Sequence, residues 1–228
     1  MSLILNIDTS SENASVCIAR DGIQIALFEN PEQKDHAAWV HQAVKKSLEH
    51  VNCTVQDLKA VAVTAGPGSY TGLRVGMSTA KGLCYALNIP LITENTLRVM
   101  ALASKQALNN LSDKQNILFC PMIDARRMEV FTALFNPALE QVMQSSALIL
   151  NSNAFSDQLA ESEIIFSGNG SKKFQQFVKH PHAIFAEIYC SATHLALLSN
   201  NKFVSKDFDD IAYSEPLYLK EFYTLPKK

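Results

Sequence analysis

The sequence predicts an α/β fold of two halves that share one order of elements: three strands followed by helix, strand, helix, strand and helix (βββαβαβα). Three observations lead to this prediction. Apolar runs of strand length recur along the chain, and stretches with apolar residues at helical spacing alternate with them. A polar, helix-breaking segment at 108–116 separates the first series from the second. The expected domains are residues 1–108 and 109–228, with the last residues packing back on the first half, and the expected ligand site is the cleft between them.

The first half follows from short-range signals. Asp21-Gly22 stands between two apolar runs and indicates a hairpin. Asp35 is a suitable N-cap for a helix that ends near residue 50, because Val40, Val44 and Leu48 fall on one face. The expected strands cover 3–8, 14–20, 23–29, 60–65 and 90–93, and the later helices cover 72–87 and 95–108.

The second half repeats this order without visible residue identity to the first. Its expected strands cover 117–123, 130–135, 141–149, 163–166 and 183–185. Its expected helices cover 152–160, 171–178 and 191–199.

Composition and charge exclude several classes of protein. The formal net charge is −2, and the basic residues occur as pairs such as Lys45-Lys46, so the chain is not expected to hold RNA or DNA tightly by itself. Five cysteines without C-x-x-C spacing favour reduced thiols in a cytoplasmic protein. No apolar run approaches the length of about 18 residues that a membrane span needs, and residues 1–8 read as a strand rather than a signal peptide.

The glycine-rich segment 65–76 lies between an expected strand and an expected helix. Unpaired amides at a helix start can face an anion, but the glycines also serve a plain turn. A Walker loop is excluded because Leu73-Arg74 follows Gly72, and the dinucleotide fingerprint is excluded because the loop is one residue too long. Asp8, Thr9 and Ser10 at the end of the first strand could likewise either contact a phosphate group or simply form a turn. The residues expected to give weak nucleotide or phosphate contact are Asp8, Thr9, Ser10, Gly66, Gly68 and Ser69.

Small residues recur along the helix that follows this loop. Gly72, Gly76, Thr79 and Gly82 stand three or four positions apart, and each interior glycine costs roughly 1 kcal/mol relative to alanine. Close approach of another backbone would explain this cost. The partner is either another element of this chain or a second protein. A polar stripe on another side suits an interface rim or water, and it consists of Arg74, Ser78, Lys81 and Tyr85.

The sequence contains no recognisable catalytic constellation. His36 and His41 stand five residues apart on one helix, so they cannot readily chelate one metal ion. No H-E-x-x-H or G-x-S-x-G segment exists. The charged residues Asp124, Arg126, Arg127 and Glu129 flank an expected hairpin and suggest a surface ion-pair cluster.

Together these segments resemble the TsaB (YeaZ) family, which takes part in making threonylcarbamoyladenosine in tRNA and is related to TsaD and other glycoprotease-like proteins. The matching segments are 7–10 with the following hairpin, 64–76, 80–83, 123–131 and 216–220. The departures are small: His36-Ala37-Ala38 replaces His-Ser-Glu, Met128 replaces a glycine, and Lys220 replaces an arginine.

The resemblance implies an actin-like ATPase (ribonuclease H-like) fold with two duplicated halves. It also implies a catalytic paralogue, TsaD, which binds a metal through H-x-x-x-H. The two histidine positions fall on Thr96 and Met100, which cannot replace histidine ligands. The implied role is a non-catalytic scaffold with no metal and no tightly bound cofactor.

In that family the first half pairs with TsaD, the pair recruits the ATPase TsaE, and the adenosine 3′ of the anticodon is modified. The resemblance therefore implies tRNA contact only through the complex, homodimers when the partner is missing, ATP or ADP at the joint surface and no membrane. The expected partner interface consists of His36, Trp39, Gly72, Arg74, Val75, Gly76, Ser78, Thr79, Lys81, Gly82 and Tyr85. Two alternatives stay open: a metal-dependent glycoprotease-like peptidase and an actin-like-fold small-molecule kinase.

Overall fold

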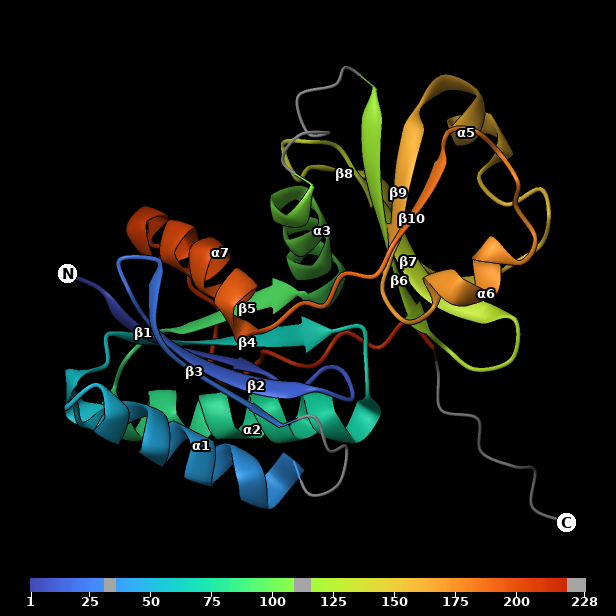
Figure 1. The fold of residues 1–228 in the computed structure, drawn as a ribbon. Coiled ribbons are helices and arrows are strands. Elements are labelled where there is room, and N and C mark those ends of the chain that lie inside the picture. The colour runs from blue at the N-terminus through green and yellow to red at the C-terminus, as the bar shows by residue number, and fades with distance from the viewer. Residues whose placement is uncertain (31–35, 109–115, 221–228) are drawn as a thin grey trace, which may run out of the picture.

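The computed structural model describes residues 1–30, 36–108 and 116–220, with His36 described as backbone only. Two five-stranded sheets form the two halves of the molecule (Figure 1). Their strand orders are β3-β2-β1-β4-β5 and β10-β9-β6-β7-β8, which are the same order when the second is read from β8. In both, the first three strands are antiparallel and the later pairings are parallel. The predicted duplication of βββαβαβα is confirmed.

The first half agrees closely with the predicted elements. Its elements are β1 (Leu3–Asp8), β2 (Ala14–Arg20), β3 (Ile23–Asn30), α1 (His36–His50), η1 (Val55–Asp57), β4 (Ala60–Gly66), α2 (Tyr70–Leu87), β5 (Leu91–Asn95) and α3 (Thr96–Ala107). Helix α2 begins two residues earlier than expected because the Ser69 side chain caps it by accepting from the Gly72 amide. The predicted N-cap Asp35 lies outside the described residues.

The second half has shorter helices on its sheet. Its elements are β6 (Ile117–Asp124), β7 (Glu129–Phe135), β8 (Gln141–Ile149), α5 (Ser156–Glu161), β9 (Glu163–Ser167), α6 (Ser171–Gln175), β10 (Ala183–Ala186) and α7 (Ala192–Ser205). Helix α7 runs six residues beyond the predicted end at 199. It ends only at Lys206, which adopts a left-handed backbone conformation. The Lys206 amide donates to the Lys202 and Phe203 carbonyls.

Helices cover both faces of the first sheet. Helices α1 and α2 lie on one face and α7 lies on the other (Figure 1). Leu195 and Leu198 of α7 join a core cluster with Ile4 and Ile92, and the buried Ser199 hydroxyl donates to Asn6 Oδ1 at 2.6 Å. The last helix of the second series therefore packs on the sheet of the first.

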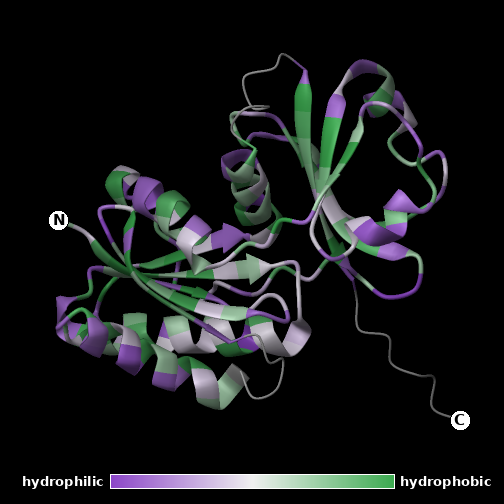
Figure 2. Cartoon of the chain, in the orientation of Figure 1, coloured by the Kyte–Doolittle hydropathy of each residue, from purple (hydrophilic) through white to green (hydrophobic). Residues whose placement is uncertain are grey.

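Helix α3 connects the two cores. Leu97 and Met100 pack with Phe119 of the second sheet, whereas Val99 and Leu102 belong to the cluster of the first sheet. Figure 2 shows apolar strands at the centre of each half and mixed polarity along α1 and α2. The two halves are thus joined by buried apolar side chains and not only by the chain connection.

Residues 206–220, here called the C-terminal strap, return across the first half. The Asp209 amide donates to the Leu91 carbonyl at 2.9 Å, and the Leu217 amide donates to the Ala65 carbonyl at 2.6 Å. Between these points Lys81 Nζ donates to the carbonyls of Ala212 and Ser214. The strap therefore ends beside the glycine loop.

The five cysteines are free, and Cys17, Cys84 and Cys120 are buried. Burial raises the pKa of Cys17 and of Cys120 to about 12, which keeps these thiols protonated and unreactive. Within residues 1–30, 36–108 and 116–220, every helix is too short or too polar to cross a membrane.

Candidate functional site

The turn after β1 is built around the Asp8 carboxylate. Asp8 is 1% exposed, and its Oδ1 accepts from the Ser10 hydroxyl at 2.6 Å, the Ser10 amide at 3.0 Å and the Thr64 hydroxyl at 2.8 Å. The Cys190 thiol donates to Oδ2 across 3.9 Å. The carboxylate therefore organises the β1–β2 turn and ties it to β4 through Thr64.

Thr9 and Ser10 hold the glycine loop against this turn. The Thr9 hydroxyl donates to the Gly72 carbonyl at 2.7 Å, and the Ser69 amide donates to the Ser10 carbonyl at 2.7 Å. Both residues are buried. The structure brings all the predicted phosphate-contacting residues together, but the hydroxyls of Thr9 and Ser10 already serve internal hydrogen bonds.

The glycines of the loop permit close packing. Gly66 has φ +115°, and a Cβ there would lie 2.7 Å from the Leu217 carbonyl oxygen of the strap. A Cβ at Gly68 would collide with the Ser10 carbonyl. These positions need glycine because backbone approaches backbone, which is the turn interpretation of the motif.

Gly72 and Gly76 were predicted to lie in the partner interface, but the structure places them inside this chain. Both are buried within this chain, and a Cβ at either position would collide with Thr9: with its carbonyl oxygen from Gly72 and with its hydroxyl from Gly76. Thr79 is only 8% exposed. The first two glycines of the stripe therefore contact the β1–β2 turn, and they are not available to a second protein.

The outer face of α2 carries other predicted interface residues. Arg74, Ser78 and Gly82 are exposed, Tyr85 is 84% exposed, and a Cβ at Gly82 would meet nothing within 4 Å. Val75 is half-buried, and Lys81 is held by the strap. On α1, Trp39 is half-buried against the first core, and the side chain of His36 lies outside the description.

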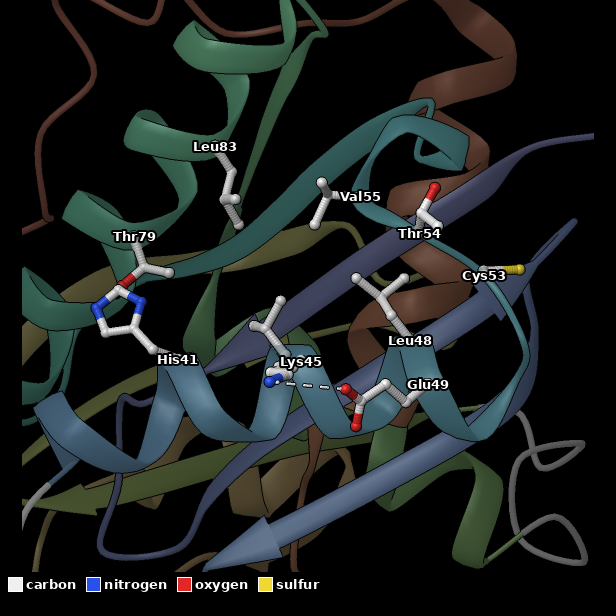
Figure 3. Close-up of a pocket in the computed structure, with 10 residues that line it drawn as sticks. His41, Lys45, Leu48, Glu49, Cys53, Thr54, Val55, Thr79 and Leu83 are labelled. Atoms are coloured by element: carbon white, nitrogen blue, oxygen red, sulfur yellow. Dashed lines mark ion pairs between the residues drawn. The ribbon is translucent and has the colours of Figure 1, made fainter.

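An apolar groove of about 350 Å³ lies between α1 and α2 (Figure 3). Val44 and Leu48 of α1 and Leu83 of α2 line it, together with Thr79. Lys45 and Glu49 also line it and form an exposed ion pair at 3.8 Å. The sequence did not predict this groove, because it depends on how far apart the two helices lie.

A second groove, of about 780 Å³, lies between the glycine loop, the β6–β7 turn and the strap; we call it the strap groove. Its charged and aromatic lining consists of Tyr70, Arg74, Arg126, Phe131, Tyr218 and Lys220. The Arg74 guanidinium carbon lies 4.1 Å from the centre of the Tyr70 ring, and its Nε donates to the Tyr218 hydroxyl at 3.1 Å.

The β6–β7 turn does not form the predicted ion-pair cluster. Asp124 instead pairs with Lys173 at 2.6 Å, and Glu129 pairs with Lys220 of the strap. Burial alone would raise the pKa of Asp124, but the hydrogen bonds from Lys173 and the Arg126 amide outweigh it and lower that pKa. Arg126 and Arg127 form no ion pair with the residues that the structure describes, and both have left-handed backbone, with φ of 68° and 49°.

The two positions where the resemblance places metal-binding histidines are buried in this chain. Thr96 is 1% exposed and its hydroxyl is buried without a hydrogen-bond partner in the described chain, while Met100 is 9% exposed. The Met100 methyl group packs so closely on Gly168 that a Cβ there would collide with it. Beside them Asn169 Oδ1 accepts from the Asp124 amide at 2.9 Å. Across the described ranges no group of three or more His, Cys, Asp or Glu side chains could hold a metal ion.

These features define a class of protein: an actin-like α/β fold of two duplicated halves, with its glycine loop packed on the turn that follows the first strand. Two solved structures share this fold. One is YeaZ from Pseudomonas aeruginosa, with a TM-score of 0.79 and 21% identity. The other is described as a Pseudomonas aeruginosa protein with similarity to peptidase YEAZ, with a TM-score of 0.83 and 22% identity. Each likeness covers 96% of this chain and 100% of the other.

The sequence comparisons agree. The family profile described as TsaD, tRNA N6-adenosine threonylcarbamoyltransferase, matches residues 30–222. The Bacillus subtilis TsaB, a tRNA threonylcarbamoyladenosine biosynthesis protein, is 29% identical over 95% of this chain and 93% of its own length. The Haemophilus influenzae TsaB is 25% identical over 98% and 96%. The chain belongs to this family, in its TsaB (YeaZ) group.

Proposed function

We propose that this chain is a non-catalytic subunit of the machinery that makes threonylcarbamoyladenosine in tRNA, the process after which its TsaB relatives are named. The observation that carries the proposal is the burial of Thr96 and Met100, with the Met100 methyl group packed on Gly168. The resemblance aligns these two positions with the metal ligands of a metal-dependent relative, and a thioether and a hydroxyl are poor substitutes for imidazole.

The glycine-loop site supports the same role. The Asp8 carboxylate and the Thr9 and Ser10 hydroxyls are buried in internal hydrogen bonds, so they offer a phosphate little beyond the amides of the loop. No lysine lies in this loop to neutralise a transferred phosphoryl group. We therefore expect weak nucleotide binding by the chain alone and assign any ATP or ADP to a surface shared with a partner.

The outer α1–α2 surface is the proposed pairing surface. The apolar groove and the exposed Gly82 and Tyr85 of α2 offer small and aromatic residues that another helix can contact. The proposed partner is a TsaD-like transferase in the cytoplasm. In this proposal the pair works with a TsaE-like ATPase on the adenosine 3′ of the anticodon, and two copies of this chain pair through the same surface when that partner is missing.

Pairing is tested by an arginine placed at Gly82, where a side chain meets nothing in this chain. The Gly82→Arg variant and the TsaD-like protein from the same genome are co-expressed and purified through a tag on one of them. Recovery of the partner should fall at least tenfold while the melting temperature stays within a few degrees. Asn201→Arg is the matched control, because Asn201 is an exposed position on α7, on the opposite face of the sheet.

Normal recovery with Gly82→Arg would place the partner elsewhere on the molecule. Elemental analysis of the purified chain is the second measurement. About one tightly bound metal ion per chain would contradict the non-catalytic role and favour the metal-dependent peptidase.

A further inference from the structure

The strap groove contains a concentration of cations and aromatic rings that the pairing role does not use. Arg74, Arg126 and Lys220 line it. Among the described residues, the one carboxylate that forms an ion pair with any of these three cations is that of Glu129, which pairs with Lys220. Arg126 is exposed and forms no ion pair in the part of the chain that the structure describes. In a chain with a net charge of −2, this groove has a local excess of positive charge and suits an anion.

The rings give the groove a second property. The Tyr70 and Tyr218 ring centres lie 5.2 Å apart with a tilt of 39°, and Phe131 lines the same groove. Tyr218 is 42% exposed, so part of its ring faces solvent. Exposed aromatic rings beside arginines are the arrangement on which unpaired nucleic-acid bases stack, with the phosphates against the cations.

We propose that the strap groove binds single-stranded RNA, with a base stacked on Tyr218 and the adjoining phosphate at Arg126. This inference rests on the proposed function, because it makes this subunit contact the tRNA substrate directly. An RNA strand fits this groove of about 780 Å³ better than a free nucleotide, because its cations come from α2, the β6–β7 turn and the strap and so offer contacts to more than one phosphate. The buried polar groups next to it, Asp8 and Thr9, already have internal partners.

The groove is assembled from three distant segments of the chain. Tyr70 and Arg74 lie in the first turns of α2, Arg126 in the β6–β7 turn, and Tyr218 in the strap. The strap is held there by the bond from the Leu217 amide to the Ala65 carbonyl. Because this bond is between backbone atoms, substitution of an exposed side chain in the groove should leave the strap in place.

The test measures the binding of a fluorescent anticodon stem–loop RNA by anisotropy, both to the full chain and to its complex with the TsaD-like partner. Tyr218→Ala should weaken binding at least fivefold, the low end for loss of one stacked base. Tyr218→Phe should bind nearly as well as the unchanged chain, because it keeps the ring and loses only the hydroxyl bonded to Arg74. Tyr213→Ala is the matched control, since Tyr213 is 85% exposed on the same strap but does not line the groove.

The charge is tested by two adjacent residues with the same backbone conformation. Arg126→Gln should lower the affinity and reduce the slope of log K against log salt by about 1, as expected for one lost phosphate contact. Arg127→Gln removes the same charge from the same turn outside the groove and should change both much less.

Equal losses from Arg126→Gln and Arg127→Gln, or from Tyr218→Ala and Tyr213→Ala, would overturn the proposal. Displacement of the RNA by ADP at concentrations far below those of cellular nucleotide would also overturn it, in favour of a free-nucleotide pocket. Recovery of the TsaD-like partner by the same variants separates the two proposals. If the partner is recovered normally but each groove variant binds RNA as its control does, the groove proposal alone is refuted. If the unchanged chain also fails to pair with the partner, the proposed function is refuted.

Discussion

The two faces of helix α2 use small residues for opposite purposes. On the inner face, Gly72 and Gly76 bring the helix backbone against Thr9, so that no side chain fits between them. On the outer face, Gly82 is exposed and nothing lies where its Cβ would be. A glycine inside a helix therefore indicates close approach of another element only when something faces it.

Helix geometry explains why one apparent stripe divides into two. A helix turns once in 3.6 residues, so a four-residue step overshoots a full turn and a three-residue step falls short by roughly 60°. Gly72 and Gly76 stay on one face, but two successive short steps, to Thr79 and then to Gly82, rotate roughly 120° away. Thr79 lies at the edge beside α1, and Gly82 faces solvent.

The largest expected effect comes from Gly72→Val on the inner face. Its Cβ would collide with the Thr9 carbonyl oxygen, which is backbone in a buried turn and cannot move aside easily. The free energy of unfolding should fall by about 3 kcal/mol or more, measured by denaturant titration. Gly82→Val is the control and should change the free energy of unfolding by no more than about 0.5 kcal/mol, because the position is open and the helix propensity of valine is no worse than that of glycine. Similar losses from the two variants would show that the two faces do not differ.

Gly76→Ala should have an intermediate effect, about 1 to 3 kcal/mol of lost stability. Its Cβ would collide with the Thr9 hydroxyl and lie 3.3 Å from a Val63 methyl group. The hydroxyl can rotate away only by giving up its bond to the Gly72 carbonyl. Lost stability should therefore precede any loss of partner binding.

A double-mutant cycle sharpens this second prediction. Thr9→Ala removes the group with which the new methyl collides, so Gly76→Ala in that background should cost less than in the unchanged chain. Strict additivity of the two losses in thermal or chemical unfolding would mean that the collision with Thr9 does not cause the effect.

Gly82→Ala should have the smallest effect, and its sign should be opposite. The position is helical and open, so alanine should raise the free energy of unfolding by about 0.5 to 1 kcal/mol through helix propensity. Differential scanning calorimetry detects this as a small rise in melting temperature. A fall would indicate that Gly82 contacts another part of the chain.

The sequence predicted the order of elements well because that order depends on neighbouring residues. The apolar runs of β1 to β3, the Asp21-Gly22 turn and the apolar positions of α1 are local patterns, and the structure reproduces them. The end of α7 was predicted too early, because Phe203 and Lys202 continue a helix whose stability comes from packing on the first sheet.

The candidate site was predicted only in part. The glycine loop and the Asp8 turn were both predicted to contact a phosphate, and in the structure they lie against each other. Arg126 and Tyr218 were not connected, because they stand far apart in sequence and meet only through the strap. One amino-acid sequence read by itself gives no local signal for such a contact.

The sequence by itself determined the two-half α/β fold and the positions of its turns. The tertiary structure alone decided which face of α2 is buried, which core receives α3 and α7, and that three remote segments form one cationic, aromatic groove. The reason is physical: helix and strand periodicity is set within about ten residues, whereas each of these outcomes depends on packing between residues remote in the chain.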